Sequence, residues 1–326
     1  MAKMKKRELI IIVVFSLLTI ASWYLMTSWT VRDIWYGIGY EPSAGVQNIH
    51  DELELTDRGQ RIFRGARPAL EESEAFNQHC DSHNLEVALL GCYADGQIYV
   101  YEITNQDLVD ANKVTMAHEL LHAAWLRMSD RERERVTELM NQVAEANTSE
   151  WQKTELSAYA DQDSKVLTEE KYTRIGTKVR DLPEDLESHY AMYFKNRAKI
   201  VDFYEKYQAP LIELKNKTDQ LGKELLAERD AIATDRQSYE TELESLNLAI
   251  QKFNNCASTM GCFTSDAVFE QERNTLNTRQ TNLDSVRVSL NDRIDQTNAK
   301  LNEYQQNLRT LGELNNAMNS NVIESL

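Results

Sequence analysis

The chain has 326 residues and a formal net charge of −16. This length allows a core domain and a further segment, and the charge argues against non-specific binding to nucleic acid or to anionic lipid. The sequence contains no glycine-rich phosphate loop, which argues against a nucleotide-dependent enzyme. Its 11 glycines and 4 prolines favour long helices over many tight turns.

A basic segment at residues 3–7 precedes an apolar run from Leu9 to Met26. As a helix, this run of 18 residues would be about 27 Å long, close to the thickness of a bilayer core. We therefore predict that residues 1–30 are a transmembrane anchor and that residues 9–26 contact the lipid. The basic flank predicts a cytoplasmic N-terminus, with everything after about residue 30 outside. A cleaved signal peptide is the alternative, but no small-residue cleavage site follows the apolar core.

Residues 31–60 have the composition of an irregular linker, and polar helical sequence follows them. The next segment has β-branched and aromatic residues on both sides of Asp95 and Gly96, a dipeptide that favours a tight hairpin turn. Strands are therefore predicted near residues 85–93 and 97–104.

The predicted hairpin precedes a segment of small and apolar residues that indicates a helix over residues 111–128. Ser129 and Glu132 have the spacing of a capping box, so a second helix is predicted to start there and to run to about residue 146. Further helices are predicted near residues 150–160 and, after a first-turn proline, over residues 184–207.

The sequence changes character at about residue 208. Apolar residues then recur at steps of three, four or seven, and residues 254–266 interrupt this pattern once. Two heptad arms around a short loop predict an antiparallel coiled-coil hairpin over residues 208–326. Each arm of about 45 residues would be roughly 70 Å long. The narrow apolar stripe favours a rigid arm without chemistry of its own, which could bind a protein partner.

The four cysteines fall into two local pairs. Cys80 and Cys92 are twelve residues apart, and Cys256 and Cys262 are six apart. Neither pair has the two-residue spacing of a zinc knuckle, so we predict two local disulfides in an oxidising space outside the cytoplasm. Four free, buried thiols are the alternative.

The segment TMAHELLHAAW, residues 115–125, places His118 and His122 four positions apart with Glu119 between them. Residues i and i+4 of a helix point in the same direction, so the two imidazoles can bind one metal ion. Glu119 lies on the adjoining face, where its carboxylate can hold a metal-bound water and take its proton. Zn²⁺ is the predicted metal, because two imidazoles, a carboxylate and a water form the hydrolytic zinc arrangement. The alternative is a pair of histidines without a metal.

With this motif the chain resembles the zincin metallopeptidases, and in particular an uncharacterised group of bacterial membrane-anchored HExxH proteins. The resemblance covers about residues 85–205, and HELLH is its specific part. It implies a zinc-dependent endopeptidase with a small mixed sheet and the histidine helix beneath the cleft. Residues 97–104 would then be the edge strand that binds the substrate backbone by strand addition.

The third metal ligand is expected downstream of the two histidines. Position 128 is Met128 where a metzincin would have a third histidine, which favours a gluzincin-like glutamate. The candidates are Glu155, Glu170 and Glu187. In the proteins that the chain resembles, the ligand glutamate precedes a Gly-Thr pair by a fixed step, and Glu170 has that position before residues 176–177.

A donor to the developing negative charge of the reaction is also expected near the ligands. The residues available are Tyr172, His189 and Tyr190, of which Tyr172 and His189 are the predicted catalytic groups. Tyr172 stands where the resemblance leads us to expect a histidine. For each of these residues, a packing role in the core is the alternative.

Taken together, these patterns predict an α+β chain with three parts. They are an N-terminal transmembrane helix at residues 1–30, a helix-rich zincin-like domain with a small sheet at 31–207, and the coiled-coil hairpin. The predicted function is hydrolysis of peptide bonds outside the cytoplasmic membrane, in a peptide, a protein or a cell-wall peptide. The alternative is a catalytically inactive, metal-bearing scaffold that acts through its coiled-coil arm.

Overall fold

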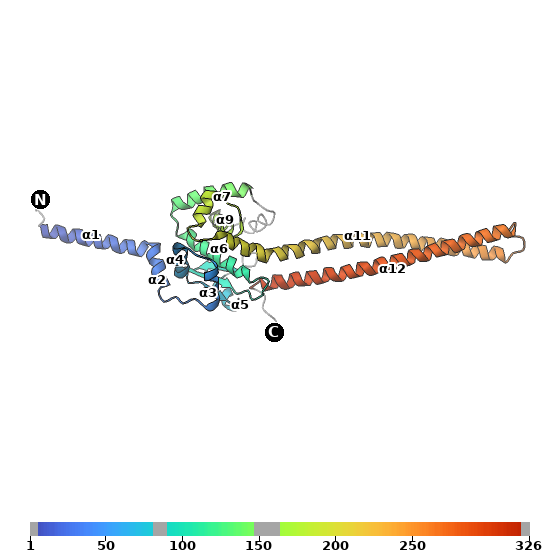
Figure 1. Cartoon of the computed structure of the whole chain (residues 1–326), viewed down its shortest axis with the longest axis horizontal. Helices are drawn as coiled ribbons and strands as arrows, with labels where there is room; N and C mark the ends of the chain where they lie inside the picture. The colour runs from blue at the N-terminus through green and yellow to red at the C-terminus, as the bar shows by residue number, and fades with distance from the viewer. Residues whose placement is uncertain (1–5, 81–89, 147–163, 321–326) are drawn as a thin grey trace. The chain divides into compact units, whose positions relative to one another are not determined.

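The computed structural model describes residues 6–80, 90–146 and 164–320 (Figure 1). In these residues the protein is a mostly helical α+β structure with a small three-stranded mixed sheet and two long C-terminal helices packed together. The chain divides into two compact units. The first comprises Met1–Pro210 and Glu313–Leu326, and the second comprises Leu211–Gly312.

The N-terminal part of the first unit is helical. Helix α1, Lys6–Thr27, contains the apolar run that was predicted to be an anchor. Among the helices of the described ranges, none is long and apolar enough to cross a membrane, so the predicted transmembrane helix is not confirmed.

The prediction of an irregular linker over residues 31–60 is wrong. This segment contains α2, α3 and α4, at Trp29–Gly37, Ala44–Glu52 and Asp57–Ala66. Side-chain caps explain the starts of two of these helices, since the hydroxyls of Ser43 and Thr56 accept backbone N–H groups at 3.3 Å and 3.1 Å. Each capped helix also buries an apolar face, which a composition argument does not detect.

The sheet has the strand order β1-β3-β2. Strands β2, Gly91–Ala94, and β3, Gln97–Tyr101, form the predicted antiparallel hairpin, and Asp95 and Gly96 turn the chain with φ of 51° and 80°. Residues 85–89 of the prediction lie outside the described residues. Strand β1, Ala69–Glu71, was not predicted and pairs in parallel with β3. Since β3 is the central strand, the expectation that it forms the substrate-binding edge is wrong.

Helix α6, Asp110–Leu126, carries the histidines and corresponds to the helix predicted over 111–128. Its first turn is attached to the end of β3, because the buried Asn112 amide bonds both the N–H and the C=O of Ile103, at 3.1 Å and 2.9 Å. Helix α7, Asp130–Ala146, follows Ser129, which accepts the N–H of Glu132 at 3.3 Å as the capping box predicts. The helix predicted near 150–160 lies outside the described residues.

The remaining helices of the first unit differ from the prediction. Helix α5, Ser73–His79, follows β1, and α9, Ser164–Lys178, was not predicted. The helix predicted over 184–207 is split into α10, Glu184–Tyr190, and α11, which begins at Arg197. The break has a physical reason, because residues 193–195 bond the backbone of residues 54–56 instead of continuing the helix. Thr56 N–H donates to the carbonyl of Tyr193, and Lys195 N–H donates to that of Glu54.

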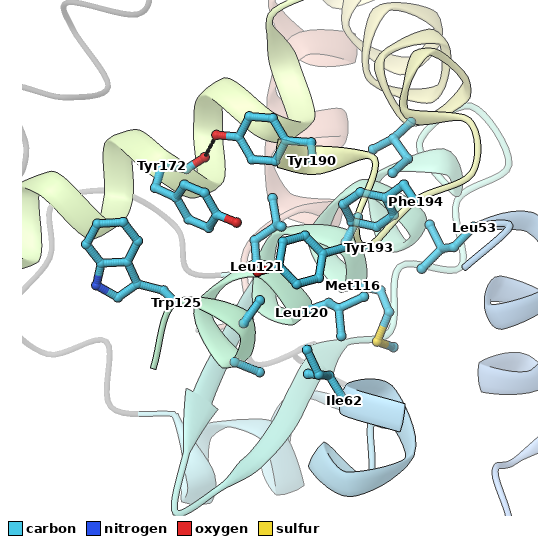
Figure 2. Packing of buried hydrophobic residues seen from close by; sticks show 14 of the residues in the cluster. Leu53, Ile62, Met116, Leu120, Leu121, Trp125, Tyr172, Tyr190, Tyr193 and Phe194 are labelled. Carbon is cyan, nitrogen blue, oxygen red and sulfur yellow. Dashed lines mark hydrogen bonds between the residues drawn. The ribbon is translucent and has the colours of Figure 1, made fainter. Parts of the chain in front are cut away.

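One apolar core joins α6, α9 and α10 to the N-terminal helices (Figure 2). Its largest fully buried side chains include Tyr172, Tyr190, Tyr193 and Phe194. The Tyr190 hydroxyl donates to the carbonyl of Tyr172 at 2.7 Å, so this buried polar group has a partner. The core therefore fixes α9 against α6, and these are the two helices that carry the predicted metal ligands.

The second unit consists of the long helices α11, Arg197–Ala257, and α12, Asp266–Ala317, between Leu211 and Gly312 (Figure 1). Its best-buried leucines form the seam between the two helices: Leu221, Leu246, Leu283 and Leu290. Ion pairs cross the seam in antiparallel order, joining Lys300 to Glu224 at 3.1 Å and Arg279 to Glu242 at 2.8 Å. The predicted pairing of two long helices is confirmed, although α11 begins before residue 208 and continues through Pro210.

Both predicted disulfides are present. Cys80 is bonded to Cys92 and Cys256 to Cys262, with Cα–Cα distances of 5.9 Å and 5.4 Å. The first bond joins the end of α5 to β2, and the second closes the loop between α11 and α12. Two disulfides indicate an oxidising environment, which is found outside the cytoplasm.

Candidate metal centre

Helix α6 presents His118 and His122 one turn apart, and α9 brings Glu170 to them. The two Nε2 atoms are 3.2 Å apart. Glu170 lies 3.7 Å from His118 Nε2 through Oε2 and 3.3 Å from His122 Nε2 through Oε1. All the candidate ligand atoms lie within 4.8 Å of one another. The three predicted metal ligands therefore converge from two helices.

The spacing of these donor atoms is compatible with a tetrahedral metal ion. Zinc binds nitrogen and oxygen donors at about 2.0–2.2 Å, and tetrahedral geometry then separates any two donors by about 3.3–3.6 Å. The two Nε2 atoms, 3.2 Å apart, are close to that separation, and each has one oxygen of Glu170 at 3.3 Å or 3.7 Å. Without a cation, two imidazole nitrogens and a carboxylate at such distances must share protons to stay close. This His-His-Glu group could therefore hold a metal ion.

The close approach of α9 to α6 depends on a small residue. Gly176 packs against Leu121, and a Cβ atom at position 176 would lie 2.5 Å from Leu121 Cδ1 and 2.6 Å from Tyr190 Cε1. Any larger residue would push α9 away from the histidines. Because Glu170 stands on the same helix, Gly176 helps to set the distance between the carboxylate and the imidazoles.

Glu169 is a residue of the site that the sequence did not reveal. Its Oε1 lies 2.8 Å from His122 Nδ1, so it can accept the N–H there and leave the Nε2 lone pair facing Glu170 and His118. Metal-binding histidines commonly have such a carboxylate partner, which fixes the tautomer and the ring orientation. The adjacent pair Glu169-Glu170 was the available signal, but consecutive residues of a helix point about 100° apart, and only the fold brings both to the histidines.

Opposing charges hold Glu170 and His122 in ionised forms. Burial alone would raise the pKa of Glu170, but its contacts with His122, His118 and Arg174 lower that pKa to about 2. Burial likewise opposes the charge on His122, but the hydrogen bonds to Glu169 and Glu170 outweigh it and raise the pKa of His122. His122 must lose this proton to bind a metal, so metal binding should release a proton. Burial lowers the pKa of His118 well below its usual value and keeps that imidazole neutral.

Glu119 is buried next to the ligands, with only 4% of its surface exposed. Its carboxylate lies against the backbone at the start of β2, where a Cβ atom at Gly91 would be 2.8 Å from Glu119 Oε1. A side chain at position 91 would therefore displace Glu119 or its neighbour Thr115. Burial raises the pKa of Glu119 to about 8, with further increases from the charges of Glu170 and Glu169. This carboxyl group can accordingly gain and lose a proton near neutral pH.

Tyr172 and His189 form a separate pair in the core. The Tyr172 hydroxyl lies 3.0 Å from His189 Nε2, and its ring packs between Trp125 and Tyr190 (Figure 2). Burial raises the pKa of Tyr172, so the phenol keeps its proton and donates a hydrogen bond to the imidazole of His189. None of the hydrogen bonds found among the described residues joins this pair to the metal ligands. Their predicted role toward the substrate stays a prediction, which complete burial of Tyr172 does not favour.

The buried His189 predicts a pH dependence of stability. Burial lowers its pKa to about 4, whereas an unfolded histidine has a pKa of about 6.5. The unfolded chain therefore binds more protons between these values, so stability falls as the pH drops from about 6.5 to 4. Replacing His189 with glutamine should remove about 2–3 kcal/mol of this loss. Urea unfolding at pH 7 and 4, followed by tryptophan fluorescence, measures it, since all five tryptophans precede residue 211. An equal pH slope in both proteins would contradict the prediction.

The other two ligand candidates have different positions. Glu187 holds Arg197 in a bidentate ion pair with distances of 2.6 Å to 3.0 Å. Arg197 also donates to the carbonyls of Val179 and Arg180, so the pair ties the end of α9 to the start of α11. The position of Glu187 is thus explained by its ion pair with Arg197 and not by metal binding. Glu155 lies outside the described residues. Among the candidates that the structure describes, Glu170 is the one that joins the histidines.

Comparisons of the chain with protein-family models, with curated proteins and with solved structures found no match. The resemblance to zincins therefore stays a prediction, and the chemistry of the site rests on its own geometry.

Proposed function

We propose that the protein is a zinc-dependent peptidase that acts outside the cytoplasm. The observation that supports this proposal most strongly is the convergence of His118, His122 and Glu170, with Glu119 buried beside them. Two imidazoles and one carboxylate are the protein ligands of hydrolytic zinc sites. Peptide bonds in proteins and in cell-wall peptides are both suitable substrates for this chemistry.

In the proposed reaction His118, His122 and Glu170 would hold the metal. A bound Zn²⁺ lowers the pKa of a water molecule and polarises the substrate carbonyl. Glu119 takes the proton of the attacking water at its carboxylate and transfers it to the leaving amine. The buried position of Glu119 beside the ligands suits this shuttle, because a bound water would lie within reach of its carboxylate. Glu169 holds His122 in the tautomer that offers Nε2.

The substrate backbone is proposed to bind along β2 instead of the central strand β3. Within the described ranges β2 pairs only with β3, so its other side is an edge of the sheet. Gly91 of β2 lies against Glu119, which would bring an added strand close to the catalytic base.

Metal analysis tests the metal centre directly. The purified protein should contain one zinc ion per chain, and Glu170→Ala should lose stoichiometric zinc because it removes one of three ligands. Glu169→Gln removes only the orienting partner of His122, so its zinc affinity should fall by roughly tenfold to a hundredfold. Glu184→Ala is the matched control, since this glutamate is exposed in the first turn of α10. Wild-type protein without stoichiometric metal would end the proposal.

The finer localisation is also a proposal. The apolar side chains of α1 that the structure describes include Phe15, Leu17 and Trp23, which are exposed. Their exposure supports association of residues 9–26 with lipid, and the two disulfides support a site outside the cytoplasm. Recovery of the protein in the membrane fraction, with the disulfides intact, would agree with this proposal.

A metal-bearing scaffold without catalytic activity is the second candidate. One observation favours it, because the tip of the second unit exposes Met260 fully on a loop closed by a disulfide. Such a tip could bind a protein partner. Zinc-loaded protein that cleaves neither a peptide library nor cell-wall stem peptides would support the scaffold over the peptidase.

A further inference from the structure

The surface formed by α2 and α4 carries apolar side chains that the fold does not bury. Trp35 and Ile38 are 72% and 70% exposed, and Ile34 and Tyr36 beside them are exposed as well. Four large apolar or aromatic side chains within five residues are an unusual density for a surface exposed to water. Of these four residues, Ile34 and Ile38 lie beside Arg61 and Arg64 of α4, and we call all six residues the α2–α4 surface.

Two arginines of α4 lie at this surface. Arg61 and Arg64, together with Ile34 and Ile38, line a hollow of about 530 Å³ between α2 and α4. Arg64 donates weakly to the carbonyls of Gly37 and Tyr40, at 3.5 Å and 3.3 Å. The Nε atom of Arg61 is buried and has no hydrogen-bond partner. The guanidinium groups of Arg61 and Arg64 can donate hydrogen bonds to acceptor oxygens placed in the hollow.

The charge of this surface is opposite to that of the chain as a whole. Two carboxylates also line the hollow, those of Asp33 and Asp57. Asp33 is neutralised by Arg127 at 2.6 Å, which leaves Asp57 against the two arginines. Arg32 is a further cation of α2, and its guanidinium stacks on Trp29 at 4.3 Å. A local positive charge therefore persists in a protein of net charge −16.

The position of α2 in the chain indicates what covers this surface. Ser28 alone separates α1 from α2, and α1 exposes the apolar side chains of Phe15, Leu18 and Trp23. The exposed apolar residues thus continue from one helix into the next and end beside the arginines. Aromatic and aliphatic residues next to arginines are the composition of helices that lie in the headgroup region of a bilayer.

We propose that the α2–α4 surface docks on a lipid surface and that an anionic headgroup occupies the hollow between Arg61 and Arg64. Trp35 and Ile38 enter the region between the headgroups and the acyl chains. The headgroup phosphate accepts hydrogen bonds from the guanidinium groups of Arg61 and Arg64, which both line the hollow. Docking would hold the first unit against the bilayer in one orientation, independently of the chemistry at the metal centre.

The test uses the full-length protein in vesicles whose acyl chains carry bromine, which quenches nearby tryptophan. The contribution of Trp35 is the difference between wild type and Trp35→Phe. Quenching of Trp35 should increase as phosphatidylglycerol is added to phosphatidylcholine. Each arginine near an anionic surface contributes about 1 kcal/mol, so the double variant Arg61→Gln, Arg64→Gln should bind anionic vesicles roughly thirtyfold more weakly, as measured by this quenching.

Three comparisons decide the outcome. The control variant Arg229→Gln, Arg236→Gln removes the same charge from exposed positions of the second unit and should behave as wild type. Ile38→Ser changes an exposed side chain without affecting the core and should also weaken quenching. Equal quenching in phosphatidylcholine alone, or an arginine double variant that matches its control, would overturn the headgroup site. Absence of quenching in every vesicle would show that lipid does not cover this surface.

Discussion

Glu119→Gln should keep its zinc and lose hydrolysis by roughly a hundredfold to ten-thousandfold, the range associated with a general base. The amide has nearly the same shape as the carboxylate, so it fits against Gly91 where the wild-type side chain lies. It cannot accept the proton of the attacking water. Because Glu119 is absent from the group of candidate ligands, the zinc content should not change. Parallel measurement of metal content and of peptide cleavage by both proteins checks this result.

The matched control is Glu169→Gln, which makes the same chemical change at a residue that contacts His122. Saturating zinc should restore most of its activity, whereas it should restore none in Glu119→Gln. The same turnover in wild type and Glu119→Gln would assign any cleavage to a contaminant or to a different base. This result would contradict the proposed role of Glu119 but would not contradict the metal site.

Asp33→Ala should destabilise the first unit by about 3–5 kcal/mol, because it leaves a buried guanidinium without its counter-charge. The side chains of Asp33 and Arg127 are only 2% and 5% exposed, and three of their N–O distances lie between 2.6 Å and 3.0 Å. Arg127 also donates to the carbonyl of Ala123 at 2.6 Å. The ion pair therefore fastens α2 to the end of the histidine helix. Urea unfolding followed by tryptophan fluorescence reports on this unit alone.

Two further variants separate burial of charge from loss of an ion pair. Asp202→Ala removes one of the two exposed carboxylate partners of Arg180, the other being Glu205, and should cost at most about 1 kcal/mol. The double variant Asp33→Leu, Arg127→Met removes both buried charges and should recover much of the stability lost by Asp33→Ala. A small effect of Asp33→Ala alone would show that water reaches this pair in solution.

Local patterns in the sequence were sufficient to predict the histidine helix α6, the β2–β3 hairpin and both disulfides. The four-residue spacing of His118 and His122 fixes their common direction on any helix. Asp95 and Gly96 similarly determine a turn through their own backbone conformations. Glu170 was identified by resemblance to other proteins, because nothing in its neighbouring residues distinguishes it from a surface glutamate.

Features that depend on distant segments were not predictable in this way. The break between α10 and α11 arises from backbone hydrogen bonds to residues 54–56, far away in the sequence. Strand β1 has only three residues and exists because β3 pairs with it. The contact of Glu169 with His122 and that of Gly91 with Glu119 likewise require the packed fold. Each of these features depends on a contact between two distant segments of the chain. The periodicity of apolar residues within one segment does not show which other segment it contacts.

The disulfide between Cys256 and Cys262 has a consequence for how the long helices assemble. It closes the loop between the end of α11 and the start of α12, so partners near it are separated by little free chain. Arg279 and Glu242 are 37 residues apart, whereas Lys300 and Glu224 are 76 apart. Since the entropy lost on closing a loop grows with its length, pairing should begin at the bonded end and proceed like a zipper.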